Sequence, residues 1–223
     1  MHCAPPERND PAAAGRIPAR HGSKRAMDVV LAVMLGLIAA PLIMVAAVLV
    51  RLSSPGPILY RAQRVGFGLK PFWIWKFRTM VEDGDELLEQ HLAEHPGRRL
   101  EWESRFKLRH DPRVTCIGRI LRMTSLDELP QLWNVLRGDM SLVGPRPIID
   151  AELPLYGSDD AAWVFARAKP GITGLWQVSG RSHAPYHERV ERDIEYVRRW
   201  GLAFDLRILL RTVATVLLCR GAY

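Results

Sequence analysis

The sequence has few cysteines, and no two of them lie at a metal-binding spacing. Cys3, Cys116 and Cys219 are the three cysteines in a chain of 223 residues, and no CxxC motif occurs. An odd, widely spaced set disfavours a disulfide framework or a cysteine zinc site and favours a reducing compartment. Glycine-rich phosphate motifs are also absent, since neither GxGxxG nor GxxxxGK[ST] is present. Nothing therefore supports a dinucleotide-binding or P-loop site.

Acidic residues are outnumbered by basic ones. Lys and Arg total 31 against 24 Asp and Glu, so the formal net charge is +7, and the pI is about 9.7. This balance favours anionic partners. Hydrophobic residues make up 48% and charged residues 25%, which excludes a collagen-like or wholly disordered chain. The length allows one domain with a sizeable core, or one domain plus an appendage.

One long segment has no charged residue. It runs from Val29 to Val50, with Gly36 and Pro41 as its only helix-disfavouring residues. As an α-helix it would be ~33 Å long, close to the ~30 Å hydrocarbon core of a bilayer. A cleaved signal sequence fits poorly, because the segment starts late and no small-x-small cleavage site follows it.

Three alternatives remain for this segment: a straight transmembrane helix, a re-entrant hairpin broken at Pro41, and a buried core helix in which Asp28 would be the odd member. Proline within a helix predicts a kink. Both flanks are basic, and basic flanks prefer the cytoplasmic side, which favours the hairpin over a span. The flanking cations are Lys24, Arg25, Arg51, Arg61, Arg64 and Lys70.

The rest of the chain predicts an α+β, mainly helical fold with few short strands. We expect a disordered tail over 1–23, the membrane hairpin over 24–52 and a compact cytoplasmic catalytic domain over 53–223. Extended segments are predicted at Ile58–Tyr60, Phe72–Phe77 and Ile172–Val178. Helices are predicted at Asp83–Ala93, Leu100–Leu108, Leu129–Leu136 with an end at Gly138, Ala184–Trp200 and Phe204–Leu218.

The pair Asp127–Glu128 has two interpretations. Ser125 and Glu128 have the spacing of a capping box, and Pro130 is tolerated only in a first helical turn, so the pair would simply begin a helix. The same position faces free backbone amides and the positive end of the helix dipole, which keeps a carboxylate ionised. An ionised Asp127 could attack phosphorus, and Glu128 could bind a cation or move a proton.

Arginines and lysines are frequent in the middle and at the end of the chain, and guanidinium groups match phosphate oxygens. Arg146 is the best placed of them, because Pro145 and Pro147 flank it. Two metal motifs are weaker: Asp83-Gly84-Asp85 resembles a DxD motif but also reads as a charged helix start, and His183 with His187 lies in a polar segment. The residues alone therefore predict a basic, membrane-inserted domain that handles a phosphorylated substrate.

A long string of residues resembles the bacterial sugar transferases, the monotopic polyprenyl-phosphate phosphoglycosyl transferases. The resemblance extends in order over about 24–220, and its main part is Arg122–Pro147. Shorter blocks agree: Lys24-Arg25-x-x-Asp28, Gln63-Arg64-Val65-Gly66, Lys76–Met80, Asp111–Val114 and Lys169–Arg181. The short chain looks most like exopolysaccharide enzymes that move galactose or glucose 1-phosphate.

The resemblance implies a function. The family transfers a sugar 1-phosphate from a UDP-sugar to undecaprenyl phosphate and releases UMP. Asp127 would be the nucleophile that forms a covalent phosphosugar intermediate, and Glu128 its catalytic partner. Both carboxylates would hold Mg²⁺. Lys76, Arg122 and Arg146 would bind phosphates by family position, and Arg78 and Arg181 are further candidates for the same role.

The resemblance also implies a location at the bacterial inner membrane. Pro41 would be the break of the re-entrant helix, amphipathic helices would lie in the interface, and the catalytic domain would face the cytoplasm. A homodimer is possible, and no nucleic-acid partner is expected. Two alternatives remain, a membrane-anchored basic binding protein and an inactive scaffold of the same fold. Since adjacent side chains on an α-helix diverge by ~100°, use of both Asp127 and Glu128 predicts an irregular backbone there.

Overall fold

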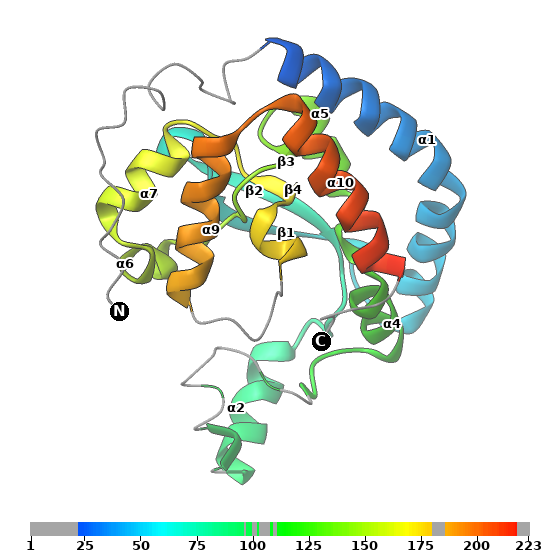
Figure 1. Ribbon diagram of the computed structural model, residues 1–223. Helices are drawn as coiled ribbons and strands as arrows, with labels where there is room; N and C mark the ends of the chain where they lie inside the picture. The colour runs from blue at the N-terminus through cyan, green and yellow to red at the C-terminus, as the bar shows by residue number, and fades with distance from the viewer. Residues whose placement is uncertain are drawn as a thin grey trace.

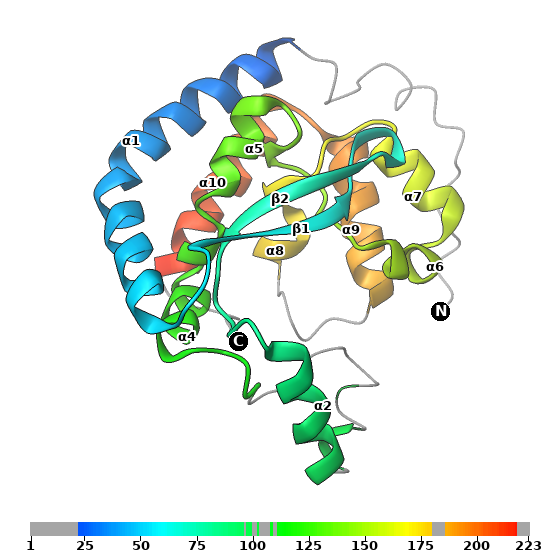
Figure 2. The ribbon, with the colours of Figure 1, turned by 180° about the vertical axis from the view of Figure 1, so that it is seen from behind.

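The computed structural model describes residues 22–95, 97–99, 102, 108, 111–179 and 186–217. In this part of the chain, helices surround two small sheets, and one long helix curves around the outside (Figures 1 and 2). Strands β1 and β2 pair antiparallel, and β3 and β4 pair parallel. The mainly helical α+β prediction is confirmed. The strands are β1 Leu59–Val65, β2 Pro71–Phe77, β3 Ser141–Val143 and β4 Gly171–Thr173.

The helices agree with most of the sequence predictions. α5 ends at Gly138, whose φ of 90° is the left-handed conformation that favours glycine there. The α-helices are α1 Gly22–Ser53, α2 Gly84–Glu94, α4 Cys116–Thr124, α5 Gln131–Arg137, α6 Leu153–Tyr156, α7 Ser158–Phe165, α8 Leu175–Val178, α9 Tyr186–Arg199 and α10 Leu202–Leu217. The 3₁₀ turns are η3 Phe67–Leu69, η4 Leu126–Glu128 and η5 Asp150–Glu152.

Two predictions about local structure were wrong. The expected extended segment Ile172–Val178 ends as a strand at Thr173, and Leu175–Val178 is the short helix α8. A short apolar run has no periodicity that distinguishes strand from helix. The first strand is longer than Ile58–Tyr60 and reaches Val65.

Two other predicted segments fall largely outside the described residues. These are most of Leu100–Leu108 and 1–21 of the expected tail, whereas Gly22 and Ser23 belong to α1.

The apolar segment forms one continuous helix, α1, which includes Pro41. By length and composition alone it could cross a membrane, and little of it is buried. Pro41 does not end the helix, so the predicted hairpin break is not confirmed. α1 instead follows an arc (Figures 1 and 2). A proline that removes one hydrogen bond and crowds the preceding turn bends a helix without necessarily ending it.

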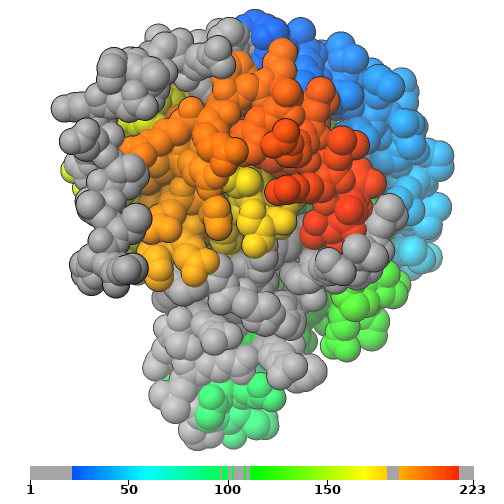
Figure 3. Space-filling model, in the orientation of Figure 1, coloured from blue at the N-terminus to red at the C-terminus, as the bar shows by residue number. Residues whose placement is uncertain are grey.

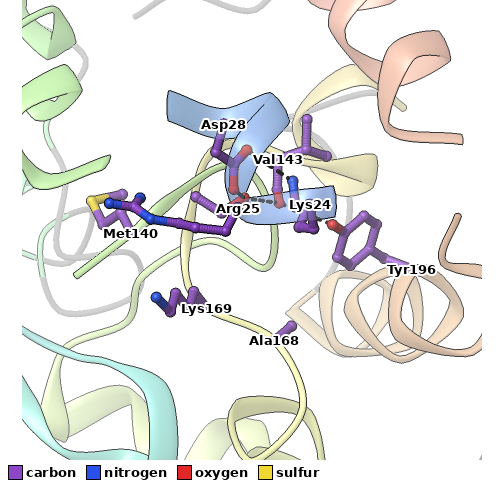
Figure 4. A pocket seen from close by; sticks show the side chains of 9 residues that line it. Lys24, Arg25, Asp28, Met140, Val143, Ala168, Lys169 and Tyr196 are labelled. Atoms are coloured by element: carbon purple, nitrogen blue, oxygen red, sulfur yellow. Dashed lines mark hydrogen bonds and ion pairs between the residues drawn. The ribbon is translucent and has the colours of Figure 1, made fainter. Parts of the chain in front are cut away.

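The first turns of α1 are bound to the body by buried charges. The Lys24 ammonium lies 3.1 Å from an oxygen of Asp28 and 2.9 Å from an oxygen of Asp205 in α10. Figure 4 shows Lys24 and Asp28 close together in the pocket that they line. Asp28 also accepts hydrogen bonds from the Ser141 hydroxyl at 2.8 Å and the Leu142 N–H at 3.2 Å, both in β3. Buried charges are tolerated when they are paired and hydrogen-bonded in this way.

Neighbouring contacts hold both ends of α1. The Arg25 guanidinium donates to the carbonyls of Val135 and Leu136, the latter at 2.7 Å, and so caps the carboxyl end of α5. At the other end, Ala46 and Val50 pack against Phe77 of β2 and Leu121 of α4. The outward side of α1 between these ends is apolar and exposed, as at Leu37, Ile38, Met44 and Val48.

α4 docks against the residues that follow β2. The Thr115 N–H donates to the Thr79 carbonyl at 3.1 Å, and the Thr115 hydroxyl caps α4 by accepting from the Gly118 N–H at 2.9 Å. A Cβ atom at Gly118 would lie 2.1 Å from the Thr79 carbonyl oxygen. Only glycine therefore allows α4 to approach Thr79 this closely.

We predict that Gly118→Ala destabilises the protein by about 1–3 kcal/mol through overpacking, although alanine is the better helix former. The matched control is Gly36→Ala in α1, where no atom lies within 4 Å of the added Cβ. Thermal unfolding of both variants in the same detergent measures the difference. Equal midpoints for the two variants would contradict the close approach of α4 to Thr79.

Candidate active site

Strand β2 positions the helices on either side of the Asp127–Glu128 turn. The buried Asn134 side chain of α5 accepts from the Trp75 N–H at 3.1 Å and donates to the Trp73 carbonyl at 2.7 Å. The amide thus satisfies two strand groups that β1 does not reach. Because α4 is held at Thr79 and α5 at Trp73 and Trp75, the turn between these helices faces the same strand.

The Asp127–Glu128 pair lies on the 3₁₀ turn η4, not within an α-helix. Ser125 ends α4 in the left-handed conformation, with φ 58°, and its carbonyl accepts from the Glu128 N–H at 3.3 Å. Its side chain makes no capping hydrogen bond, so the predicted capping box is wrong. A residue that ends one helix in the αL region does not have the extended backbone of an N-cap. The predicted irregular backbone is confirmed.

Asp127 is buried, with 9% of its surface exposed. Burial raises the pKa of its carboxyl from the usual 3.8 to about 6. Lys76 lowers this pKa, the neighbouring Glu128 raises it, and Arg122 lowers it. The net result is a carboxylate that is ionised at neutral pH and poorly hydrated, which is a favourable state for a nucleophile.

The two cations beside Asp127 come from different elements. Lys76 of β2 forms an ion pair with Glu128, 2.7 Å from Nζ to Oε1, and both side chains are partly buried. Arg122 of α4 donates from Nε to the Thr79 hydroxyl at 2.9 Å. Burial lowers the pKa of Arg122, and Asp127 and Asp111 act in the opposite direction. Both side chains are therefore held in place before any ligand binds.

A small open pocket adjoins this turn. Arg146 extends into it beside Lys76 and Glu128, and its guanidinium lies 5.9 Å from the centre of the Trp176 ring. The Arg146 carbonyl accepts a hydrogen bond from Arg189 of α9 at 3.3 Å. Three cations, Arg64, Lys76 and Arg146, thus line the pocket together with one carboxylate, Glu128. Its lining residues are Arg64, Ile74, Lys76, Glu128, Gln131, Arg146, Pro147, Gly171, Ile172 and Gln177.

The other predicted phosphate-binding residues differ in position. Arg78 is buried and donates to the Ser54 carbonyl at 2.7 Å, and a Cβ at Gly56 would contact its guanidinium. Its side chain is thus directed to the loop after α1, and its proposed phosphate role stays a prediction. Arg181 lies outside the described residues.

The weaker metal motifs receive no support from the described part of the chain. Asp83 and Asp85 are exposed at the start of α2, with Asp85 3.9 Å from Arg113. Among the described residues no group of three or more His, Cys, Asp or Glu could hold a metal ion. His187 is exposed on α9, and His183 lies outside the described residues.

Sequence reasoning assigned no role to Arg64, Thr79 or Arg189, which the structure brings to the site. Arg64 stands in a quoted block, Gln63–Gly66, but only the strand pairing shows which way it faces. Thr79 and Arg189 act through Arg122 and Arg146. No local pattern could have found them, because their partners lie 43 positions away in both cases.

A buried carboxylate under the influence of two cations, next to an arginine-lined pocket, has the chemistry of a transferase that acts on a phosphate-bearing substrate. The comparisons agree with this class. The family model described as bacterial sugar transferase matches residues 19–219. The chain belongs to the bacterial sugar transferase family and is an enzyme.

Three relatives illustrate the range of the family. The chain is 46% identical over 201 residues to the exopolysaccharide production protein ExoY of Sinorhizobium fredii, covering 90% of this chain and 88% of that protein. It is 50% identical to the undecaprenyl-phosphate galactose phosphotransferase of Salmonella typhimurium, covering 90% and 41%. It is 43% identical to the UDP-glucose:undecaprenyl-phosphate glucose-1-phosphate transferase of Caulobacter vibrioides, covering 90% and 72%.

We predict that Asp127→Asn increases stability at neutral pH. A carboxyl whose pKa is raised on folding stabilises the fold below its unfolded pKa, near 3.8, and this contribution is lost as the pH rises through about 6. The loss amounts to at most about 3 kcal/mol. Unfolding midpoints are measured for the variant and the wild-type protein from pH 4 to 7.5. The midpoint of the variant should rise relative to that of the wild-type protein as the pH rises. Parallel curves would contradict the raised pKa.

Proposed function

We propose that the enzyme transfers a hexose 1-phosphate, galactose or glucose, from a UDP-sugar to undecaprenyl phosphate, with release of UMP. The observation that carries the proposal is the buried Asp127 carboxyl, whose pKa both Lys76 and Arg122 lower, beside an arginine-lined pocket. The relatives' names support the substrates, since one acts on galactose and another on glucose. The ExoY name supports a role in exopolysaccharide assembly.

The proposed chemistry has two steps. A carboxylate oxygen of Asp127 attacks the sugar-linked phosphorus of the donor, an acyl-phosphate bond forms, and the bond to the bridging oxygen breaks with its electron pair leaving on UMP. A phosphate oxygen of the lipid then attacks the same phosphorus and releases the Asp127 carboxylate. Lys76 and Arg122 stabilise the charge on the equatorial oxygens in both steps.

Mg²⁺ is the proposed cofactor, and the donor set fits it in one specific way. Mg²⁺ in proteins is usually held by one or two carboxylates together with substrate phosphates. Asp127 and Glu128 supply those carboxylates, although Glu128 Oε1 is paired with Lys76. When bound, the ion would neutralise charge on the donor diphosphate. The two carboxylates therefore fit a Mg²⁺ ion that substrate phosphates also bind better than an ion that protein ligands alone would hold.

We also propose that α1 is a re-entrant membrane segment at the cytoplasmic face of the inner membrane. Both ends of α1 contact the same body, through Lys24 at one end and Val50 at the other. A straight span would separate these ends by the thickness of the bilayer. α10 and part of α1 lie side by side on one face of the molecule (Figure 3), and α10 carries the exposed apolar residues Leu206, Leu210 and Val213, which supports a common interfacial surface. The homodimer remains a prediction.

The function is tested by mixing the purified protein with Mg²⁺ and single UDP-sugars in the absence of lipid. We predict one UMP released per chain and a hexose-phosphate adduct that maps to Asp127, and the donor that reacts identifies the sugar. Asp127→Asn should give neither product, whereas its UMP binding should persist. Two results would favour the binding-protein or scaffold alternatives. One is turnover in the folded Asp127→Asn variant, and the other is that the wild-type protein releases no UMP from any donor even after undecaprenyl phosphate is added.

The membrane arrangement is tested by labelling single cysteines in a background without Cys3, Cys116 and Cys219. We predict that Gly22→Cys and Leu52→Cys, both at exposed positions, react with an impermeant maleimide from the cytoplasmic side. Ile38→Cys, at an exposed apolar position of α1, should react only after detergent is added. Labelling of the two ends from opposite sides of the membrane would establish a span and overturn the re-entrant arrangement.

A further inference from the structure

Arg64 lies in the same pocket as Arg146, although β1 and the loop after β3 are far apart in the sequence. The antiparallel register pairs Arg64 with Phe72 and Arg61 with Trp75. Because side chains alternate along a strand, Arg61 and Arg64 point to opposite faces of the hairpin. Arg61 is exposed and contacts the Trp73 ring at 5.1 Å. Arg64 is partly buried and lines the pocket.

A backbone hydrogen bond holds together the two segments that carry Arg64 and Arg146. The Val65 N–H donates to the Ile148 carbonyl at 2.8 Å, so the residue after Arg64 is bonded to the second residue after Arg146. Arg146 is held from its other side by Arg189, which donates to its carbonyl and lies 5.4 Å from the Trp176 ring. The arginines are therefore brought together by the fold and not by chance side-chain conformations.

The carboxyl groups near the pair act on it without forming ion pairs among the described residues: Glu152 raises the pKa of Arg64, and the charge of Arg146 lowers the pKa of the buried Asp193. Burial lowers the pKa of Arg64, and the charge of Arg146 lowers it further, against weaker contributions from Glu152 and Tyr60. No ion pair of Arg64 or Arg146 occurs within the described ranges, where the one printed hydrogen bond of the Arg64 side chain goes to the Gln63 carbonyl at 2.7 Å. Lys76, by contrast, is paired with Glu128. Two adjacent cations in a pocket repel each other until an anion binds between them.

We propose that Arg64 acts with Arg146 as a clamp for the nucleotide-side phosphate of the donor, the phosphate that leaves as UMP. This inference rests on the proposed function. In phosphoryl transfer the attacking and leaving oxygens are roughly in line, so the leaving phosphate lies across the reacting phosphorus from Asp127. The Arg64 and Arg146 pocket adjoins Lys76 and Glu128, and neither Asp127 nor Arg122 lines it. The leaving phosphate is assigned to this pocket because Arg64 and Arg146 line it and Asp127 does not.

The test compares Arg64→Gln and Arg64→Lys with Arg61→Gln. Arg61→Gln removes the same charge from the same strand on the opposite face and serves as the matched control. UMP binding is measured by titration calorimetry on the full-length detergent-solubilised protein, without donor, so the result does not depend on turnover. KM for the UDP-sugar and KM for undecaprenyl phosphate are then measured separately.

Arg64→Gln should weaken UMP binding about ten-fold or more, the loss expected for one charge-assisted hydrogen bond to a phosphate. It should raise KM for the donor by a similar factor and leave KM for the lipid unchanged, and Arg64→Lys should recover part of the loss. Arg61→Gln should bind UMP with the affinity of the wild-type protein.

Three results would overturn the clamp: unchanged UMP binding in folded Arg64→Gln, an equal loss in Arg61→Gln, or an increase confined to KM for the lipid. The last would assign the arginines to the acceptor phosphate. If Arg64→Gln does not fold, Arg64→Lys decides, because a lysine that binds UMP as tightly as arginine would contradict a bidentate role. Absence of UMP release by the unchanged protein would instead reject the proposed function, whereas the binding measurement would still report on the clamp.

Discussion

A strand with an unpaired edge needs partners for its buried backbone groups, and in this protein those partners determine the active site. β2 pairs with β1 on one side only. Asn134 bonds to the backbone of Trp73 and Trp75, and Thr115 bonds to Thr79 just beyond the end of the strand. These contacts fix α5 and α4, so the connecting turn has little freedom. Lys76 then faces Glu128 because it lies on the strand to which both helices are attached.

The turn itself separates the two carboxylates into different environments. Adjacent residues on a 3₁₀ turn are rotated by about 120°, so the side chains of Asp127 and Glu128 leave the turn in different directions, although Glu128 is close enough to raise the pKa of Asp127. Asp127 is buried and its pKa is raised to about 6, whereas Glu128 lines the pocket and holds Lys76. In the proposed mechanism this arrangement shields Asp127, the nucleophile, from water. It also leaves Glu128 in the pocket, where a ligand can replace Lys76 as its partner. Burial of Asp127 costs stability that the charges of Lys76 and Arg122 offset only in part.

The sequence predicted the elements with strong local signals, and it failed where long-range contacts decide. The helix ending at Gly138 follows from apolar spacing and one glycine. The capping box at Ser125 fails because that residue already ends α4 in the left-handed region. Arg64 stands in the block Gln63–Gly66, but no local signal gives the direction of its side chain, which follows from the register with Phe72 and from the bridge between Val65 and Ile148. The family resemblance identified the Asp127–Glu128 pair. A sequence motif does not show which basic side chains converge on that pair: Arg78, for example, bonds to the Ser54 carbonyl instead.

The attachment of α1 explains how a pocket for soluble and lipid substrates can stay close to one surface. Lys24 joins Asp28 of α1 to Asp205 of α10 in a buried network, so the two apolar helices keep a fixed relation to the body. At the other end of α1, Val50 packs on Phe77, the last residue of β2, one position after Lys76. The same strand therefore carries Lys76 of the candidate site and the contact for the apolar helix. Any shift of α1 relative to β2 would disturb the packing of Phe77 as well as the position of Lys76. β2 therefore sets the depth of the candidate site relative to α1, and a lipid phosphate held at the membrane interface would meet the site at that depth.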